Sequence, residues 1–173
     1  SIYQKREFSK MQEEKAEALA HMVNHDTITG LCNRKHLLEL LQQELLVVEN
    51  KLTALYAVDV VNLRTINDAY GHDMGDNVLR HVAAILKEEF KDHSHHIGIY
   101  HTQFLIVDSE VSEIEGINCR ASQLVRRLSH TTIIDRMEIG IKVNMGVALA
   151  PEHSMEAKLL LKKANAQKKV KNT

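Results

Sequence analysis

The segment at residues 58–76 constrains the fold of this chain more than any other part of it. It continues an apolar run that predicts a buried strand, and it leads into an amphipathic pattern that predicts a helix. Such a passage presents a strand-end carboxylate, Asp59, near the free backbone N–H groups of a helix start, with Asn67 and Asp76 following. This arrangement suits a nucleotide, because helix-start amides bind phosphates and carboxylates bind divalent cations.

The composition indicates one domain with a sizeable core. Of the 173 residues, 44% are hydrophobic, and the formal net charge is −1. This charge gives no reason to expect nucleic acid or a membrane surface as a partner. No apolar run approaches the roughly 18 residues of a membrane span, so we expect no direct membrane contact. We expect Cys32 and Cys119 to be reduced and the chain to be cytoplasmic, including as the cytoplasmic part of a membrane-anchored sensor.

Residues 1–25 predict a linker helix, because they contain no glycine or proline and are rich in good helix formers. Apolar side chains fall on a and d positions of a heptad, interrupted by Lys15: Phe8, Met11, Ala18 and Met22. The helix could pair in a parallel dimer or pack back on the domain, and two or three heptads leave both alternatives open. The chain begins without methionine, which we take to indicate a piece of a longer protein, with residues 26–173 forming the domain.

The remaining pattern alternates strands and helices. We expect helices over residues 34–49, 73–90, 112–128 and 156–171, and strands over 53–61, 97–100, 103–107, 131–134 and 138–149. We place Asn67 on a short bend, and we expect Ser112 and Glu115 to form a capping box. The order predicts an α/β fold (an α+β sandwich): a mostly antiparallel central sheet, a ferredoxin-like β-α-β-β-α-β core, and helices on both sides.

The segment at 58–76 resembles the substrate half of the GGDEF family, the diguanylate cyclase domains, whose pattern is roughly D-x-D-x-F-K-x-I-N-D-x-x-G-H-x-x-G-D. The matching positions are Asp59, Ile66, Asn67, Asp68, Gly71, His72, Gly75 and Asp76. Residues 26–34 match the family's D-x-L-T-G-L-x-N-R with Ile28 for leucine, and 144–151 match S-x-G-I-A-x-x-P with Asn144 for serine. The resemblance covers residues 26–172 and implies a nucleotidyl-cyclase-like arrangement of the core.

The resemblance also implies nucleotide-binding residues. Asn67 and Asp76 stand where the family reads guanine, His72 belongs to the adjoining turn, and Asp59 stands at the metal position. An amide and a carboxylate can pair with the N1, N2 and O6 groups of guanine. The alternative is that Asn67 ends a turn and Asp76 caps a helix without any ligand. The second acidic position on the strand is Val61, so the metal role of Asp59 is expected to be vestigial.

The catalytic hairpin departs from the family. Its GG[D/E]EF positions hold Tyr100, His101, Thr102, Gln103 and Phe104, of which only the phenylalanine is retained. By resemblance, the third position binds metal and the fourth is needed for catalysis. Threonine and glutamine supply neither negative charge, and phosphoryl transfer depends on charge neutralisation by metal. We therefore expect no catalytic residues here, and a hairpin of altered shape.

Three further features are less specific. The family's inhibitory R-x-x-D motif would fall at residues 91–94, which contain no arginine, so cyclic di-GMP binding there is not expected. In the shortened terminal motif, Lys168 and Lys171 are candidates for phosphate contact, with neither assigned. Clustered histidines could hold zinc, but their spacing fits no standard site and favours a solvated loop: His93, His95, His96 and His101.

Three functions remain under consideration. The first is an inactive regulatory or dimerisation module of a bacterial cyclic di-GMP signalling protein, between an upstream sensor and a downstream output domain of the EAL type, with a homodimer as one form. The second is a GTP sensor that binds GTP, with Mg²⁺, without turnover; no cofactor is required. The third is a diguanylate cyclase with weak residual activity that converts two GTP to cyclic di-GMP.

Overall fold

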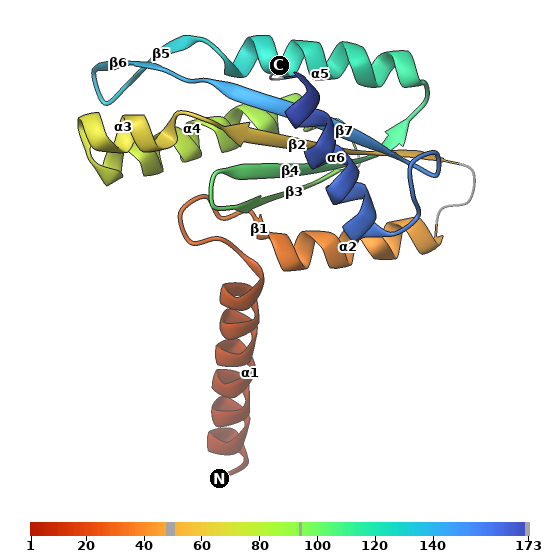
Figure 1. Cartoon of the computed structure of the whole chain (residues 1–173). Coiled ribbons are helices and arrows are strands. Elements are labelled where there is room, and N and C mark those ends of the chain that lie inside the picture. Colours follow the sequence, from red (N-terminus) through yellow and green to blue (C-terminus); the bar gives the residue numbers. More distant parts are fainter. Residues whose placement is uncertain (48–50, 94, 172–173) are drawn as a thin grey trace.

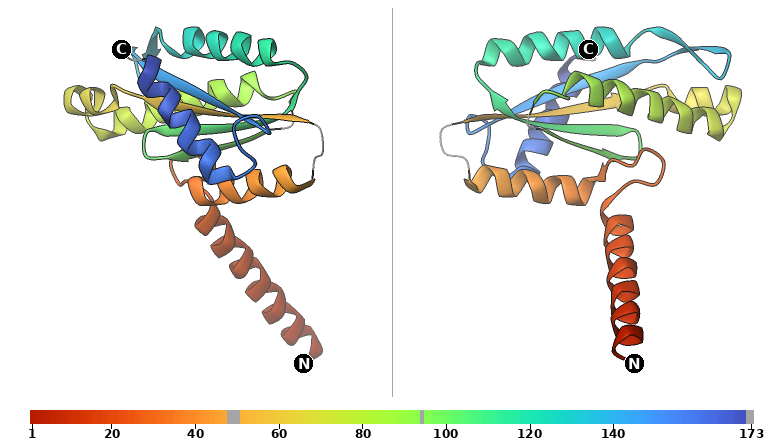
Figure 2. Two further views of the ribbon diagram at one scale, coloured as in Figure 1. Left: turned by 45° about the vertical axis from the view of Figure 1, so that its right-hand side comes forward. Right: turned by 180° about the vertical axis from the view of Figure 1, so that it is seen from behind.

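The N-terminal helix α1 (Ile2–Asn24) stands away from the rest of the chain (Figures 1 and 2). The computed structural model describes residues 1–47, 51–93 and 95–171. Ser1 and Gln4 form a capping box at the start of α1, and residues 2–23 are all exposed. The helix is therefore not packed back on the domain, and the apolar side chains of its heptad seam, Phe8, Met11 and Met22 among them, face solvent.

Five strands form the central sheet in the order β1-β3-β4-β2-β7. They are β1 (Cys32–Asn33), β2 (Leu52–Val60), β3 (His95–Tyr100), β4 (Gln103–Val111) and β7 (Val143–Ala150). β2 lies between β4 and β7 and is antiparallel to both, β3 is antiparallel to β4, and β1 is parallel to β3. The predicted fold class is confirmed, while the two-residue strand β1 was not predicted.

Helices cover both faces of the sheet (Figure 1). The helices are α2 (Arg34–Val47), α3 (Leu63–Tyr70), α4 (His72–Glu89), α5 (Ile114–Leu128) and α6 (Ala157–Lys171). Alternate residues of β2 divide the core: Tyr56 and Val58 pack with α3, α4 and α5, whereas Leu55 and Ala57 pack with α2 and α6. Asp59 continues the second set, so its side chain emerges on the α2–α6 face.

Several predicted details are wrong. Asn67 lies on the helix α3 and not on a bend, because the buried Leu63 and Ile66 give this segment one apolar face. The N-cap of α5 is Glu113, and no side chain caps it, so Ser112 and Glu115 form no capping box. The run at 138–149 is divided between β7 and a separate hairpin of β5 (Thr131–Ile134) and β6 (Met137–Gly140). The predicted extension of α2 through Val48 and Glu49 lies outside the described residues.

The turn between α1 and α2 agrees with its sequence. The Asp26 carboxylate accepts from the backbone N–H of Thr29 (2.7 Å), and Gly30 adopts a φ of +74°, which glycine takes without strain. The Asn33 side chain accepts from the N–H of His36 (2.9 Å), as expected of a helix cap. Within the described ranges, no helix is both long enough and apolar enough to cross a membrane.

Candidate functional site

The two strand positions that carry the family's chemistry are neighbours in the sheet. Asp59 on β2 is paired in register with Gln103 on β4 and with Asn144 on β7. Side chains that are directly opposite on antiparallel strands point to the same face. Asp59 and Gln103 therefore share the face that α6 covers, and we call these two residues with Asn165 and Lys168 of α6 the α6-covered site.

Helix α6 supplies a partner to both strand residues. The Lys168 ammonium forms an ion pair with the Asp59 carboxylate, with the lysine side chain 9% exposed and the aspartate side chain 31% exposed. One turn earlier, the Asn165 carbonyl oxygen accepts a hydrogen bond from the Gln103 amide (2.7 Å). On the outer side of β7, Gln167 accepts from the backbone N–H of Val147 (2.5 Å). One turn of α6 is thus bonded to three strands.

Gly146 allows α6 to come this close to β7. A Cβ atom at this position would lie 2.0 Å from the Ala164 carbonyl oxygen and 2.8 Å from Cγ of Lys168. No side chain can be accommodated there unless the helix moves, because the nearer atom belongs to the helix backbone. The aliphatic part of the Lys168 side chain therefore lies against the backbone of Gly146, where there is no Cβ atom.

The α6-covered site does not fit the divalent cation that the resemblance implies. A hard cation prefers several oxygen ligands, usually with more than one carboxylate or a phosphate. Here the one carboxylate, Asp59, is already paired with an ammonium, and the neighbouring hairpin residues Thr102 and Gln103 are uncharged. Throughout the part of the chain that the structure describes, no three His, Cys, Asp or Glu side chains are grouped so as to hold a metal.

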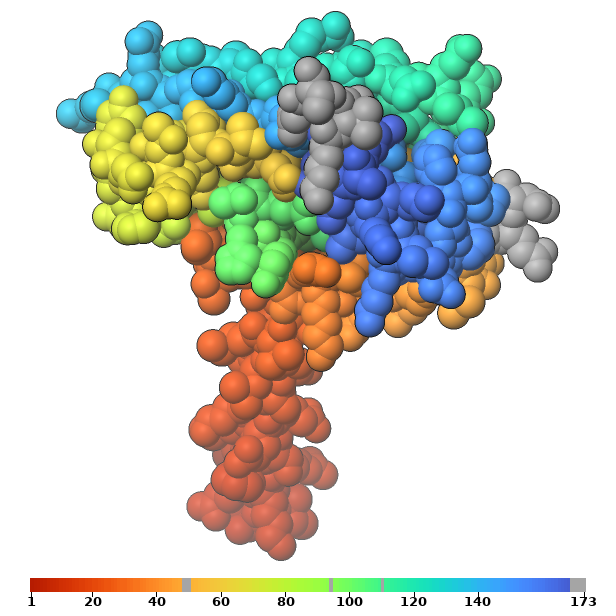
Figure 3. All heavy atoms as spheres, in the orientation of Figure 1, coloured from red at the N-terminus to blue at the C-terminus, as the bar shows by residue number. Residues whose placement is uncertain are grey.

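The hairpin between β3 and β4 turns at His101 and Thr102, without either glycine of the family pattern. His101 stands at the second glycine position and adopts a φ of +55°, a left-handed conformation that costs a non-glycine residue about 1 kcal/mol or more. The Val60 N–H donates to the Thr102 carbonyl oxygen (3.0 Å), which joins the turn to the end of β2. Tyr100 is half exposed, and the space-filling view shows the hairpin at the surface between α3–α4 and α6 (Figure 3).

The predicted guanine-reading residues, Asn67 and Asp76, lie on α3 and α4, and together with Gly75 we call them the α3–α4 site. The Asn67 side chain lies against the backbone of α4, since a Cβ atom on Gly75 would be only 1.8 Å from its carbonyl oxygen. That oxygen is buried and accepts no hydrogen bond from any described residue. Asp76 is the fifth residue of α4 and so does not cap it, while His72 is the exposed first residue.

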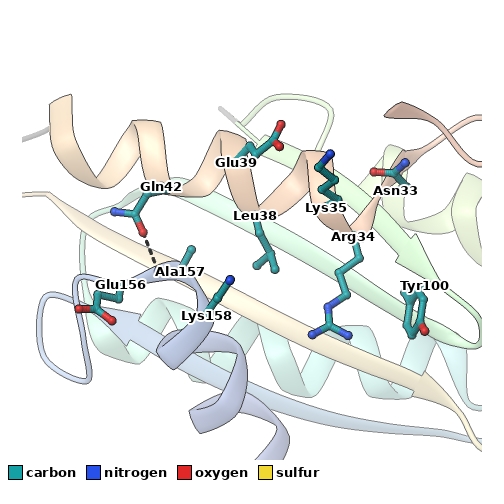
Figure 4. A pocket seen from close by; sticks show the side chains of 10 residues that line it. All are labelled: Asn33, Arg34, Lys35, Leu38, Glu39, Gln42, Tyr100, Glu156, Ala157 and Lys158. Carbon is teal, nitrogen blue, oxygen red and sulfur yellow. Dashed lines mark hydrogen bonds between the residues drawn. The ribbon is translucent and has the colours of Figure 1, made fainter. Parts of the chain in front are cut away.

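A separate groove of about 860 Å³ lies between α2, the start of α6 and the hairpin (Figure 4). Its lining is Asn33, Arg34, Lys35, Leu38, Glu39, Gln42, Tyr100, Glu156, Ala157 and Lys158. Gln42 accepts from the N–H of Ala157 (3.0 Å), and the Arg34 guanidinium lies 5.3 Å from the centre of the Tyr100 ring. None of Asp59, Asn67 and Asp76 lines this groove, so it is not the site that the sequence predicts.

The clustered histidines have partners within the fold. His95 and His96 lie on β3 and not in a solvated loop, so that expectation is wrong for these two. His96 Nε2 lies 3.0 Å from a Glu44 oxygen, and the Arg120 guanidinium donates to His93 Nε2 (2.8 Å). At the place of the inhibitory motif, residues 91–93 hold no arginine, and Ser94 lies outside the described residues.

Sequence reasoning missed the role of Lys168. Among the described side chains of α6, the buried ones are Ala157, Leu160, Leu161, Ala164 and Lys168, so the lysine continues an apolar stripe at helical spacing. This periodicity was the available signal, because a lysine on the buried stripe of a helix needs an anionic partner. The side chain of Lys171, the other candidate for phosphate contact, and residues 172–173 of the terminal motif lie outside what the structure describes.

The chain is similar to proteins of one family. The family model for the diguanylate cyclase, GGDEF domain, matches residues 23–173. The chain is 28% identical, over 86% of its length, to the cyclic di-GMP phosphodiesterase PdeR of Escherichia coli, of which it covers 22%. It is 27% identical, over 79% of its length, to the diguanylate cyclase DosC of Escherichia coli, of which it covers 30%. The chain thus spans less than a third of each of these two relatives.

Solved structures show the same fold. The coiled coil and GGDEF domain of DgcB from Caulobacter crescentus, in complex with c-di-GMP, has a TM-score of 0.85 at 18% identity, covering 99% of this chain and 92% of that one. The GGDEF domain of YfiN from Pseudomonas aeruginosa has a TM-score of 0.78 at 22% identity, covering 84% of this chain and 87% of that one. At these identities the likeness concerns the fold alone.

Proposed function

The chain belongs to the diguanylate cyclase GGDEF domain family, and from that premise we propose that it is a catalytically inactive, regulatory GGDEF domain of a bacterial cyclic di-GMP signalling protein. One observation carries the proposal: both strand positions on which family catalysis depends are engaged by α6. Asp59 pairs with Lys168, and Gln103 bonds to Asn165. Side chains that already have protein partners in this way are not free to bind a metal or take up a proton.

The loss of charge supports inactivity on energetic grounds. A carboxylate at position 103 could accept a proton or strengthen a metal site, and an amide does neither. Each missing electrostatic contribution of this kind costs about 3 kcal/mol of transition-state stabilisation, which corresponds to a rate loss of roughly a hundredfold or more. With Thr102 and Gln103 both neutral, two such contributions are lost. Cyclase turnover is therefore not part of the proposed role.

The regulatory role is supported by the arrangement of α1. This helix projects from the domain with its apolar seam uncovered, as a helix that pairs with a second copy or continues from an upstream sensor domain would. The relatives PdeR and DosC are far longer than this chain, which agrees with a module that works between other domains in the cytoplasm. The downstream domain that we propose is of the EAL type.

GTP sensing is the second candidate, and the α3–α4 site favours it. The buried carbonyl oxygen of Asn67 accepts nothing from the described residues, and leaving a buried acceptor unsatisfied costs about 1–3 kcal/mol. Once the Asn67 side chain turns away from Gly75, a guanine base would supply donors through its N1 and N2 groups. Asp76, next to the glycine on which Asn67 rests, adds a carboxylate for the same edge.

Calorimetric titration with GTP, with and without Mg²⁺, together with a search for cyclic di-GMP, tests both candidates. We expect no product under either condition. Saturable GTP binding that Asp76→Asn abolishes and the exposed control Asp73→Asn preserves would establish the sensor. No binding at millimolar GTP would leave the module acting through protein contacts alone. Product formed at the rate of an intact family cyclase would refute inactivity.

A further inference from the structure

The burial of Lys168 requires an explanation of its own. Lysine almost always keeps its ammonium in water, because burying an unpaired charge is very costly. Yet Lys168 is only 7% exposed, and its stem crosses the bare backbone of Gly146 to reach Asp59. The burial of this ammonium group is tolerated because it is paired with the carboxylate of Asp59.

The carboxylate of Asp59 is matched by one positive charge and not by two. Two carboxylates would match a divalent cation, but the positions that the resemblance assigns to further acids hold Val61, Thr102 and Gln103. A single carboxylate is neutralised by a single positive charge, and an ammonium supplies that charge without any external ion. A divalent cation beside Asp59 alone would leave an uncompensated positive charge at a partly buried side chain.

We propose that the Lys168 ammonium permanently replaces the divalent cation at Asp59, so that α6 closes the family's metal site from within. The neighbouring bonds act in the same sense. Asn165 accepts from Gln103, and Gln167 accepts from the backbone of β7, so these two hydrogen bonds and the ion pair of Lys168 together fix this turn of α6 on the sheet. The domain then keeps its fold without metal, and no metal ion reaches Asp59 unless the lysine leaves.

A double-mutant cycle measures the pair. Asp59→Asn and Lys168→Met are compared singly and together by urea unfolding, with Lys163→Met as the control, because Lys163 is an exposed lysine on the same helix. Each single variant leaves one charge without its partner, whereas the double variant removes both. We expect the free energy of unfolding of the double variant to exceed the value obtained by adding the two single effects by at least about 1.4 kcal/mol. This difference is about tenfold in the folding equilibrium constant. Additive effects would overturn the proposal.

Mn²⁺ alone, without nucleotide, serves as the probe for the metal. Millimolar Mn²⁺ and a chelator should both leave the melting temperature of the unaltered chain unchanged. Saturable Mn²⁺ binding to the unaltered chain that Asp59→Asn removes would overturn the proposal. If Lys168→Met does not fold, this comparison of the unaltered chain with Asp59→Asn still decides it. These readouts involve no GTP, so their failure is distinct from failure of the proposed regulatory role.

Discussion

The α6-covered site and the α3–α4 site both hold residues of the family pattern, but the surroundings of those residues differ. At the first, Asp59 is retained, but its carboxylate is bonded to a lysine of the same chain. At the second, Asn67 is retained, and its buried oxygen accepts nothing from the described residues. A retained residue therefore does not by itself mark a retained ligand site. The two sites differ in whether another described residue of the same chain bonds to the retained side chain.

The difference has a physical basis in the elements that cover each site. α6 approaches β7 over a glycine, so its side chains reach across the sheet to β2 and β4. α3 and α4 also meet over a glycine, Gly75, but the contact there places an amide against helix backbone in which the Gly75 N–H already donates to the Gly71 carbonyl oxygen (3.4 Å). The first close approach completes a polar network, and the second leaves a buried acceptor without a partner among the described residues.

The largest expected effect concerns turnover. Rebuilding the hairpin with Tyr100→Gly, His101→Gly, Thr102→Asp and Gln103→Glu should give a cyclase at least about a hundredfold slower than an intact family member, equivalent to about 2.7 kcal/mol. The reason is that Val61 is still apolar and Lys168 still holds Asp59. Cyclic di-GMP formed from GTP is the readout. A rebuilt domain as fast as an intact cyclase would show that α6 does not close the site.

The two glycines should differ in their response to alanine. Gly146→Ala forces a methyl group against the backbone of α6 and should cost about 3 kcal/mol of unfolding free energy, the upper end for overpacking. For Gly75→Ala the three nearest atoms all belong to the side chain of Asn67, which can rotate, and alanine gains about 1 kcal/mol of helix propensity, so the net cost should stay below about 1 kcal/mol.

Urea unfolding measures both changes, and Gly116→Ala provides the control. Gly116 lies within α5, and a Cβ atom there would meet nothing within 4 Å, so alanine should stabilise the domain by about 0.5–1 kcal/mol. Equal losses of unfolding free energy for Gly146→Ala and Gly75→Ala would contradict this explanation. It holds that the added methyl group meets backbone that cannot move aside only at the α6 contact.

The hydrogen bond between Gln103 and Asn165 should contribute less. Gln103→Leu removes the donor and leaves the Asn165 oxygen without it, which should cost about 1 kcal/mol of unfolding free energy. Gln103→Glu should cost less than that, because the Asn165 amide can turn and donate to the new carboxylate. If leucine and glutamate are equally tolerated, this bond does not help to fix α6.

The smallest expected effect is an unchanged or slightly higher free energy of unfolding, not a loss. Asn67→Leu replaces a buried acceptor by an apolar group of similar shape, so the free domain should keep its stability or gain up to about 1 kcal/mol. The same variant should lose any stabilisation by GTP, measured as a shift in melting temperature. A loss of more than 1 kcal/mol without GTP would show that Asn67 is bonded within the fold and would remove the argument for sensing.

Much of the fold was predictable because its signals are local. The turn at 26–33 follows from Asp26, Gly30 and Asn33, and the helices α2 and α4 follow from apolar residues at helical spacing. The segment carrying Asn67 was predicted wrongly as a bend. It is eight residues long, and its apolar face is apparent only once Leu63 and Ile66 are buried against the core.

The sequence by itself determined the strands β2, β3 and β4, the family resemblance and the uncharged hairpin, since each depends on residue types close together along the chain. Only the tertiary structure decided what became of Asp59, because its partner Lys168 lies 109 positions away. A side chain's charge is fixed by its type, but its partner is fixed by which surfaces the fold brings into contact. Here a glycine on one strand lets a helix approach closely enough for its lysine to take the place that the family gives to a metal.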